Sequence, residues 1–348
     1  MKQGWKYKDF EDCLEKVVYT TKILSKDYLS DGEYPIVSQE EGLISGYWNK
    51  REDLFQLKKP VVLFGDHTRV LKYVDFDFVI GADGVKILQP IEQLFAKFLY
   101  YFLQWYKVPS LGYSRHYKLL KEITVPIPPI EEQKEICSLL DKMNRVIEAK
   151  KEQLKELDNL AQSLFYELFG DPEENNKGWK TLALGDACTL KAGKSIKASE
   201  LSETINGNLF PCYGGNGIRG YIDKFSHNIP LPIIGRQGAL CGNVNYAKAP
   251  FYATEHAVVV TPKTTIEVVW LYYVLKLMHL NQYAHGVAQP GLSVQDIEPL
   301  PLIIPPLPLQ QSFAEKVEAI ERQKELINQS IKDVQTLFDA KMDNYFGD

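Results

Sequence analysis

Three loops in the first half of the chain concentrate side chains that can hydrogen-bond to the bases and phosphates of a nucleic acid. They are Tyr47-Trp48-Asn49-Lys50-Arg51, Gly65-Asp66-His67-Thr68-Arg69 and the run 109–118. Arg, Lys, Asn and Gln can make paired contacts to base edges, while Ser, Thr, Tyr and Lys can hold phosphates. One such loop is equally well explained as a solvated turn, but three in one half, with counterparts in the other, favour recognition. The candidate side chains are Tyr47, Asn49, Lys50, Arg51, His67, Thr68, Arg69, Tyr113, Ser114, Arg115, His116 and Lys118.

The second half of the chain has loops at the corresponding places, but with different side chains. Gly65-Asp66-His67 corresponds to Gly235-Arg236-Gln237-Gly238, and the segment around Gly46-Tyr47 corresponds to 214–221. The run 112–116 corresponds to 286–291. Two domains that recognise different targets would need this combination of a shared backbone and different loop side chains. The candidates in this half are Asn216, Arg219, Tyr221, Arg236, Gln237, Asn243, His285 and Gln289.

Known catalytic motifs are matched only in part. The run Gly215–Gly220 satisfies GxGxxG, but the following residues do not have a helical pattern. Gly193-Lys194-Ser195 is similar to the end of a P-loop, yet Cys188 occupies the position of the required first glycine. Pro128-Pro129 and Pro305-Pro306 resemble the DPPY/NPPY motif of amino-methyltransferases, but isoleucine precedes both pairs where Asn or Asp would bind the target amine. The six histidines form no HxxxH pair. We therefore expect no catalytic residue and no metal ligand.

The stretch Glu131–Gly170 has the pattern of one long helix. It follows the proline-rich run 125–130 and ends at Gly170-Asp171-Pro172, a glycine and then a proline that cannot continue the helix. Apolar residues recur at alternating spacings of four and three, which is the heptad seam of a coiled coil. About 40 residues at 1.5 Å each give a rod of roughly 60 Å. The seam positions are Ile136, Leu140, Met143, Ile147, Lys150, Leu154, Leu157, Ala161, Leu164 and Leu168.

The same pattern returns 177 residues later, so the chain is a tandem repeat of a globular part followed by a rod. Phe346-Gly347-Asp348 matches Phe169-Gly170-Asp171, and Pro305-Pro306 followed by Gln310 matches Pro128-Pro129 followed by Gln133. Leu99-Tyr100-Tyr101 matches Leu271-Tyr272-Tyr273, here at an offset of 172 residues. Lysines interrupt both seams, where they either fix the register or extend toward solvent. The second seam is Phe313, Val317, Ile320, Lys324, Ile327, Ile331, Val334, Phe338, Lys341 and Tyr345.

Within the first globule, residue types and bounding Gly, Asp and Pro residues predict strands at Tyr34–Ser38, Val61–Gly65, Phe78–Ile80 and Val85–Leu88. A helix is predicted over Ile91–Tyr106, whose aromatic stripe we interpret as core. We expect a mixed α/β chain with an internal pseudo-twofold repeat. Its segments are a first globular domain (1–130), a long helix (131–170), a second globular domain (171–307) and a second long helix (308–348). The two helices are expected to pair as an antiparallel coiled coil, and pairing with other chains is the alternative.

Composition sets further bounds. The 348 residues are 45% hydrophobic and carry a net charge of −5, and the five cysteines include no CxxC pair. The acidity is concentrated in the rods: 131–170 has 6 Lys+Arg against 9 Asp+Glu, and 307–348 has 5 against 8. The globules are nearly neutral, with 18 against 17 in 1–130 and 11 against 11 in 171–306. Any contact with DNA must therefore come from local patches. The charged start of the chain is not a signal peptide and the apolar run 299–309 is too short and proline-rich for a membrane span, so we expect a reducing cytoplasm.

Two globule-plus-helix repeats, each passing through Pro-Pro and a glutamine into a heptad helix, resemble the specificity (S) subunits of type I restriction–modification enzymes. The runs Ile123–Gln133 and Leu300–Gln311 carry the resemblance, together with 216–221, 234–238 and 289–293 in the second globule. The first repeat departs from the family pattern at Gly65-Asp66-His67 and has no Gln-Pro-Gly.

The resemblance implies that each globule is a target-recognition domain for one half of a split DNA site. It also implies that the helices set the unread spacer and dock two methyltransferase (M) subunits, which carry S-adenosylmethionine and methylate adenine. Two nuclease/translocase (R) subunits, which use ATP and magnesium, can join, and the chain itself is expected to bind no cofactor. Half-sites on one face of the duplex lie about 34 Å apart per turn, a gap that a roughly 60 Å rod can bridge.

Two other functions remain open from the residues alone. The chain could be a coiled-coil scaffold whose globules bind proteins. It could also be a stand-alone methyltransferase or nuclease, although that function would require a cofactor motif that the sequence does not contain.

Overall fold

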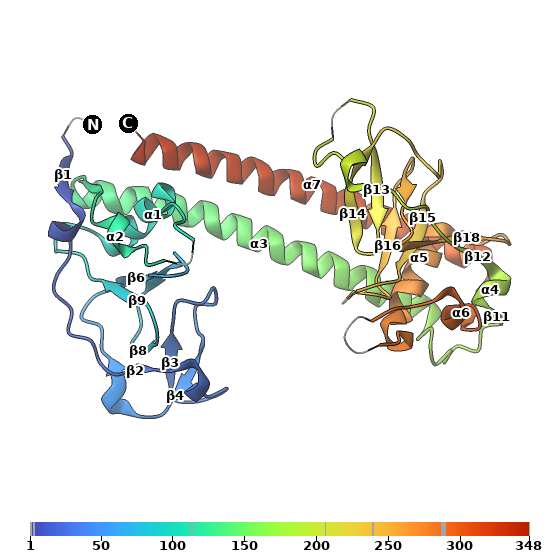
Figure 1. Cartoon of the computed structure of the whole chain (residues 1–348), viewed down its shortest axis with the longest axis horizontal. Helices are drawn as coiled ribbons and strands as arrows, with labels where there is room; N and C mark the ends of the chain where they lie inside the picture. The colour runs from blue at the N-terminus through green and yellow to red at the C-terminus, as the bar shows by residue number, and fades with distance from the viewer. Residues whose placement is uncertain are drawn as a thin grey trace. The chain divides into compact units, whose positions relative to one another are not determined.

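A computed structural model describes residues 2, 4–112, 114–205, 207–238, 240–286 and 290–347. The chain folds into two compact units: unit 1 comprises Met1–Lys151 and Gln329–Asp348, and unit 2 comprises Glu152–Asn328. Helices α3 (Ile130–Phe169) and α7 (Leu307–Phe346) are each continuous for 40 residues and contribute one part to each unit (Figure 1). The two long helices predicted from the heptads are therefore present.

The remaining elements of unit 1 are, in chain order, β1 (Lys6–Asp9), η1 (Phe10–Cys13), β2 (Lys22–Ile23), η2 (Ser25–Asp27), β3 (Tyr34–Val37), β4 (Gly46–Trp48), η3 (Arg51–Asp53), β5 (Leu54–Phe55), β6 (Val61–Gly65), β7 (Leu71–Val74), β8 (Phe78–Gly81), β9 (Val85–Leu88), α1 (Ala96–Tyr106), α2 (Tyr117–Leu120) and β10 (Thr124–Ile127).

Those of unit 2 are β11 (Thr181–Ala183), α4 (Leu184–Ala187), β12 (Cys188–Ala192), η4 (Ala198–Glu200), β13 (Phe210–Gly214), β14 (Gly217–Ile222), β15 (Leu231–Gly235), β16 (Val244–Ala247), β17 (Tyr252–Ala253), β18 (Ala257–Pro262), α5 (Val268–Leu277), η5 (Leu280–Tyr283), α6 (Val294–Ile297) and β19 (Pro301–Ile303).

The two units have the same strand frame. In unit 1 an antiparallel sheet runs β7-β6-β9, and in unit 2 the equivalent strands run β16-β15-β18, with β12 added beside β18. A second small sheet joins β3 to β4 and, in parallel, to β8; its counterpart joins β13 to β14 and, in parallel, to β17. Helix α1 packs on β6 and β7, and α5 packs on β15 and β16. The predicted mixed α/β fold with an internal repeat is confirmed.

The ends of the long helices follow from local chemistry. Helix α3 stops at Phe169 because Gly170 adopts φ +77°, where its N–H bonds to the Tyr166 carbonyl at 2.9 Å. Lys177 then donates to the last carbonyls of α3, including that of Leu168 at 3.2 Å. Lys2 caps the end of α7 in the same way, with 2.7 Å to the Tyr345 carbonyl. A cation at a helix C-terminus also complements the helix dipole.

The predicted helix over Ile91–Tyr106 is wrong at its start, since α1 begins at Ala96. Residues 91–95 form a turn, and the backbone N–H of Phe95 bonds to the side chain of Gln133 at 2.7 Å. A long-range hydrogen bond thus sets the first turn, which local periodicity could not predict. The aromatic stripe is core as expected: Phe98, Tyr101 and Phe102 are buried.

The seams of the long helices lie in the cores of the units. In unit 2, Phe313 of α7 contacts Phe165 and Phe169 of α3, with ring centroids 5.6 and 5.5 Å apart. Farther along α7, Lys324 bonds to Asp158 at 2.7 Å. As residue numbers rise on α7 they fall on α3, so the two segments are antiparallel within unit 2. In unit 1, the seam residues Ile136, Leu140 and Phe338 share one cluster with Met342 and Phe346. Near its end α7 thus buries the residues that follow the predicted seam positions Lys341 and Tyr345.

All five cysteines are free and buried. Cys13 and Cys188, which occupy equivalent repeat positions, fill core space as expected. Burial raises the pKa of the Cys13 thiol to about 11 and that of Cys188 to about 12, so neither is a reactive thiolate at neutral pH. None of the helices in the described ranges is both long and apolar enough to cross a membrane.

Candidate nucleic-acid interface

The turn between β6 and β7 presents the first group of predicted side chains in unit 1. Gly65 is favoured there, because a Cβ atom at this position would lie 2.3 Å from the Thr68 hydroxyl and 2.9 Å from the Gln39 Cβ. That hydroxyl donates to the Gln39 carbonyl at 2.7 Å, and the guanidinium of Arg69 donates to the Val108 carbonyl at 3.2 Å. The turn is thus held from two sides, with Thr68 and Arg69 exposed.

Asp66 and His116 join this turn to the second predicted loop. The Asp66 carbonyl accepts from the backbone N–H of His116 at 2.8 Å and lies 2.9 Å from its Nδ1, while Nε2 accepts from the Leu111 N–H at 3.0 Å. Nε2 is the acceptor, so Nδ1 carries the proton in the neutral ring. His116 is 1% exposed. Its ring positions the loop, and a base contact would require breaking both bonds.

Cationic side chains near the junction of Asp66 and His116 are exposed to solvent. Arg115 and Lys118 are exposed, and Ser114 is half-buried, whereas Tyr113 lies outside the described residues. A hollow of about 550 Å³ lies beside the β6–β7 turn and is lined by Thr68, Arg69 and Lys107 among others. Lys107 was not among the predicted residues; it ends α1 with φ +49°. Unit 1 therefore gathers Arg69, Lys107, Arg115 and Lys118 from three separate segments.

The third predicted loop of unit 1 lies elsewhere. Trp48 pairs with Tyr34 at the start of β3, whereas Gln39, which contacts the β6–β7 turn, follows the end of β3. Residues 49–51 are therefore at the opposite end of that strand. There the Asn49 side chain accepts from the Glu33 N–H at 3.0 Å, and Lys50 lies 5.8 Å from the Trp48 ring centroid. Tyr47 is half-buried on β4, and Arg51 is exposed.

In unit 2 the predicted loops converge. The Gly235 N–H bonds to the Asn243 carbonyl at 2.9 Å, which closes the loop between β15 and β16. The Arg236 carbonyl accepts from Leu292 at 2.9 Å, and the Gly238 N–H donates to Pro290 at 3.0 Å. These bonds tie the β15–β16 loop to the segment after His285.

The hairpin between β13 and β14 meets the same loop. A Cβ atom at Gly235 would lie 2.1 Å from the Gly215 carbonyl oxygen, so only glycine allows this approach. A hollow of about 470 Å³ lies at the junction and is lined by Gly214, Gly215, Asn216, Gly217, Ile218, Arg219, Gln237, Gly238 and His256. The GxGxxG run forms the turn between β13 and β14 and the start of β14, so no helix follows it, as expected. We refer to this hollow as the loop pocket.

Of the predicted residues in unit 2, Asn216, Arg219, Gln237, Asn243 and His285 are exposed, and Tyr221 and Arg236 are half-buried. His285 lies 3.2 Å from the Asp296 carboxylate. Hydrogen bonds from Ser293, together with the contact from His285, hold the pKa of Asp296 below its ordinary value. Gln289 falls outside the described residues.

Beside the loop pocket, the predicted Arg236 is joined by polar side chains that were not predicted. Within the described residues, Arg236 Nε, Asn245 Nδ2, Thr254 Oγ1 and Glu255 Oε2 are buried atoms that have no hydrogen-bond partner. The His256 ring is 3.4 Å from the other Glu255 oxygen, Oε1. Buried polar groups are normally satisfied, so unpaired atoms at a hollow indicate a place for an external partner. The only sequence signal was the run Thr254-Glu255-His256 before a strand.

The arrangement supplies both donors and acceptors. A guanidinium can pair with guanine, an amide with adenine and a carboxylate with the amino group of cytosine. In the part of the chain that the structure describes, no group of three His, Cys, Asp or Glu side chains could hold a metal ion.

Comparison with known proteins gives consistent matches along the chain. The sequence model described as "Type I restriction modification DNA specificity domain" matches twice, at residues 2–159 and 176–336. The type I restriction enzyme EcoprrI specificity subunit of Escherichia coli is 45% identical over 139 residues, which are 40% of this chain and 35% of that protein. The MjaIX specificity subunit of Methanocaldococcus jannaschii is 25% identical over 236 residues, 58% of this chain and 54% of that protein.

The matched regions thus span about a third and about half of the length of these two relatives. A crystal structure of the S subunit of a type I restriction–modification system from M. genitalium superposes with a TM-score of 0.65 at 18% identity. It covers 99% of this chain and 96% of that one. At this identity the likeness shows a shared fold.

Proposed function

Because the chain belongs to the type I restriction–modification DNA specificity family, whose sequence model matches both of its halves, we propose that it is the subunit that selects the DNA sequence for a type I enzyme. Each unit reads one half of a bipartite site in double-stranded DNA.

The observation that carries this proposal is the repeated frame with different loops. Both units end an equivalent buried strand in Gly, at Gly65 and Gly235, and both continue into a loop held by long-range hydrogen bonds. The side chains that follow differ: Asp66 and His67 in one unit, Arg236 and Gln237 in the other. A common frame with different donors and acceptors suits the reading of two different half-sites.

In unit 2 we assign base contacts to the loop pocket, with Arg236 and Gln237 as donors and Glu255 as acceptor. Arg219 and Asn216 lie at its rim, where contacts to phosphates fit their exposure. In unit 1 we assign phosphate contacts to Arg69, Arg115 and Lys118, which are exposed around the β6–β7 turn. Each charged contact to a phosphate releases counterions, so a nearly neutral unit can still bind DNA through a local patch.

Helices α3 and α7 are proposed to set the unread spacer and to dock two methyltransferase subunits. Their surplus of acidic residues suits contact with protein better than contact with phosphates. The chain itself is proposed to be non-catalytic and to hold no cofactor. S-adenosylmethionine belongs to the methyltransferase subunits, ATP and magnesium belong to nuclease subunits where these join, and the assembly works in the cytoplasm.

The test is a map of methylated adenines in cells that carry the partner methyltransferase subunits, with and without this chain. Expression of the chain should create methylation at one bipartite sequence. An unchanged methylation map would overturn the proposal.

A scaffold that binds only proteins is the competing function. It would be favoured if both Arg236→Ala and Arg115→Ala left DNA binding by the assembled complex untouched. A stand-alone enzyme would be favoured if the purified chain methylated or cleaved DNA by itself.

A further inference from the structure

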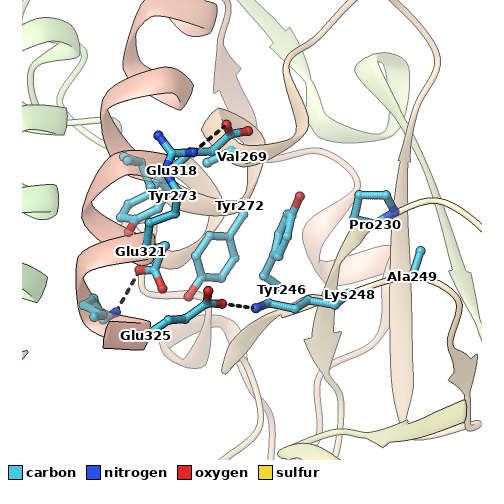
Figure 2. A pocket seen from close by; sticks show the side chains of 13 residues that line it. Pro230, Tyr246, Lys248, Ala249, Val269, Tyr272, Tyr273, Glu318, Glu321 and Glu325 are labelled. Carbon is cyan, nitrogen blue, oxygen red and sulfur yellow. Dashed lines mark hydrogen bonds and ion pairs between the residues drawn. The ribbon is translucent and has the colours of Figure 1, made fainter. Parts of the chain in front are cut away.

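Unit 2 contains a second hollow of about 540 Å³, lined by residues of β16, α5 and α7 and by Pro230. Figure 2 shows its aromatic wall, made by Tyr246 of β16 and by Tyr272 of α5, facing the side chains of α7. The rings of Tyr246 and Tyr272 are 5.6 Å apart, and those of Tyr272 and Tyr273 are 5.1 Å apart. Burial raises the pKa of all three phenols, so they are neutral at physiological pH. We call this hollow the tyrosine pocket.

The charged groups at the tyrosine pocket are mostly paired with one another. Lys248 bonds to Glu325 at 2.9 Å, and Lys324 bonds to Glu321 at 2.8 Å as well as to Asp158. Glu318 is held more loosely, since its ion pair with Arg322 is 4.0 Å long and both side chains are well exposed. The Lys276 ammonium already lies over Tyr272 and Tyr273, 5.9 and 6.0 Å from their ring centroids. The Tyr246 face and the Glu318 carboxylate are therefore the groups with capacity for a further cation.

In unit 1, a lysine of the chain itself occupies the place that is equivalent to the tyrosine pocket. There the ammonium of Lys97 lies 4.7 Å from the centroid of the Tyr73 ring and 2.9 Å from Asp141. The other Asp141 oxygen accepts from the Tyr101 hydroxyl at 2.6 Å. A lysine of the chain itself thus sits between an aromatic face and a carboxylate, an arrangement stabilised by cation–π attraction and by the ion pair.

The correspondence between the two places is set by the repeat. Leu99-Tyr100-Tyr101 matches Leu271-Tyr272-Tyr273, so Lys97 corresponds to Val269. Asp141 corresponds to Glu318 at the heptad offset of 177. Tyr73 and Tyr246 lie on equivalent strands, and each packs against the tyrosine of the helix beside it, at 6.4 and 5.6 Å. Unit 2 keeps the aromatic face and the acid but has valine where unit 1 has the lysine.

We propose that the tyrosine pocket binds a lysine side chain from a partner protein, with the ammonium over the Tyr246 ring and beside Glu318. The chain supplies this cation itself in unit 1 and takes it from outside in unit 2. We assign a methyltransferase subunit as the partner. This assignment rests on the proposed function, whereas the binding of a lysine side chain by the pocket does not. The consequence is an asymmetry: the two units offer different surfaces to otherwise equivalent partners.

The first experiment needs no partner. Nα-acetyl-lysine N-methylamide is titrated into the full chain labelled with 3-fluorotyrosine and followed by fluorine NMR, with Tyr246→Phe used to assign the resonance. We expect the Tyr246 signal to shift with the lysine probe and not with the uncharged norleucine analogue. Val269→Lys, which places an amine in the pocket as in unit 1, should abolish the shift. No shift in the natural chain, or an equal shift with norleucine, would overturn the site.

The second experiment measures affinity for the methyltransferase subunit. Val269→Lys and Glu318→Gln should each weaken binding at least tenfold. Glu315→Gln removes an exposed acid of the same helix that does not line the pocket, and it should leave binding unchanged. Equal affinity for all four proteins would refute the partner assignment, whereas a chain that directs no methylation at all would refute the proposed function instead.

Discussion

Gln133 and Gln310 make the same hydrogen bonds in the two units. The amide of Gln133 donates to the Pro128 carbonyl at 2.8 Å, and that of Gln310 donates to Pro305 at 2.8 Å. Their side-chain oxygens accept from Phe95 at 2.7 Å and from Glu267 at 3.0 Å, the residues that precede α1 and α5. Each glutamine is almost completely buried, and each joins the start of a long helix to the start of the helix on the sheet.

Replacing Gln310 by leucine should therefore destabilise unit 2 by about 1–3 kcal/mol. The substitution leaves the Glu267 N–H and the Pro305 carbonyl buried without a partner, which costs more than the loss of an average hydrogen bond. Urea unfolding followed by circular dichroism measures the effect. Gln311→Leu, one residue along the same helix and exposed, is the control, and equal effects from both would contradict this role.

The seam lysine of α7 gives a prediction about pH. Burial alone would lower the pKa of Lys324, but hydrogen bonds to Asp158 and Glu321 outweigh it and the pKa is raised above 10.5. A group with a raised pKa stabilises the fold fully below its unfolded pKa and loses that contribution as pH rises through the folded value. The stability difference between the natural chain and Lys324→Met should thus be constant up to about pH 10 and shrink above it.

Thermal unfolding of both proteins between pH 7 and pH 11 measures this difference. Lys151→Met serves as the control, because that lysine is exposed and pairs with Glu148 of its own helix. If the stability difference between the natural chain and Lys324→Met did not depend on pH, the charged ammonium would not be the source of the stabilisation.

Two substitutions should separate base reading from phosphate binding. Arg236→Ala should weaken binding of the assembled complex to its own site by about 1–3 kcal/mol and relax specificity in one half-site. Lys118→Ala should weaken binding to all sequences similarly and reduce the slope of log K against log salt by about 1.

Filter binding at several salt concentrations, with specific and scrambled duplexes, distinguishes these cases. Lys155→Ala removes an exposed lysine from α3 and controls for the change in net charge. If the losses with Arg236→Ala were the same on both duplexes, that side chain would be a phosphate contact.

The proposed role of the long helices predicts the effect of changing their length. One extra heptad in α3 alone should prevent methylation of the original site, because it shifts the seam by about 10 Å against an unchanged α7. Matched heptads in α3 and α7 should restore methylation at the same half-sites with a different spacer. Methylome sequencing records both results, and persistence of the original spacer after the single insertion would show that the helices do not set it.

Much of the fold could be predicted from short-range patterns. A heptad repeat, a helix-ending glycine and a tandem copy are properties of neighbouring residues or of plain self-similarity, so the two long helices and their ends were predictable. The same holds for the aromatic core of α1, since helical spacing alone indicates a buried face. The start of α1 was missed because a hydrogen bond from a residue 38 positions away sets it.

The candidate interface depended on contacts between segments that are distant in sequence. Residue type indicated Arg236 and His285 as candidates. Their loops lie beside Gly215 because of strand pairing and the close approach of Gly235 to Gly215. Strand pairing also left Asn49 at the other end of β3, and hydrogen bonds with Asp66 and Leu111 hold His116 as a buried structural residue. The unpaired atoms of Thr254 and Glu255 lie where several segments of unit 2 meet. The same is true of the tyrosine pocket, where the small side chain of Val269 leaves space. Sequence periodicity reports which face of an element is buried, but which side chains share a site is decided by the pairing of strands and the packing of helices.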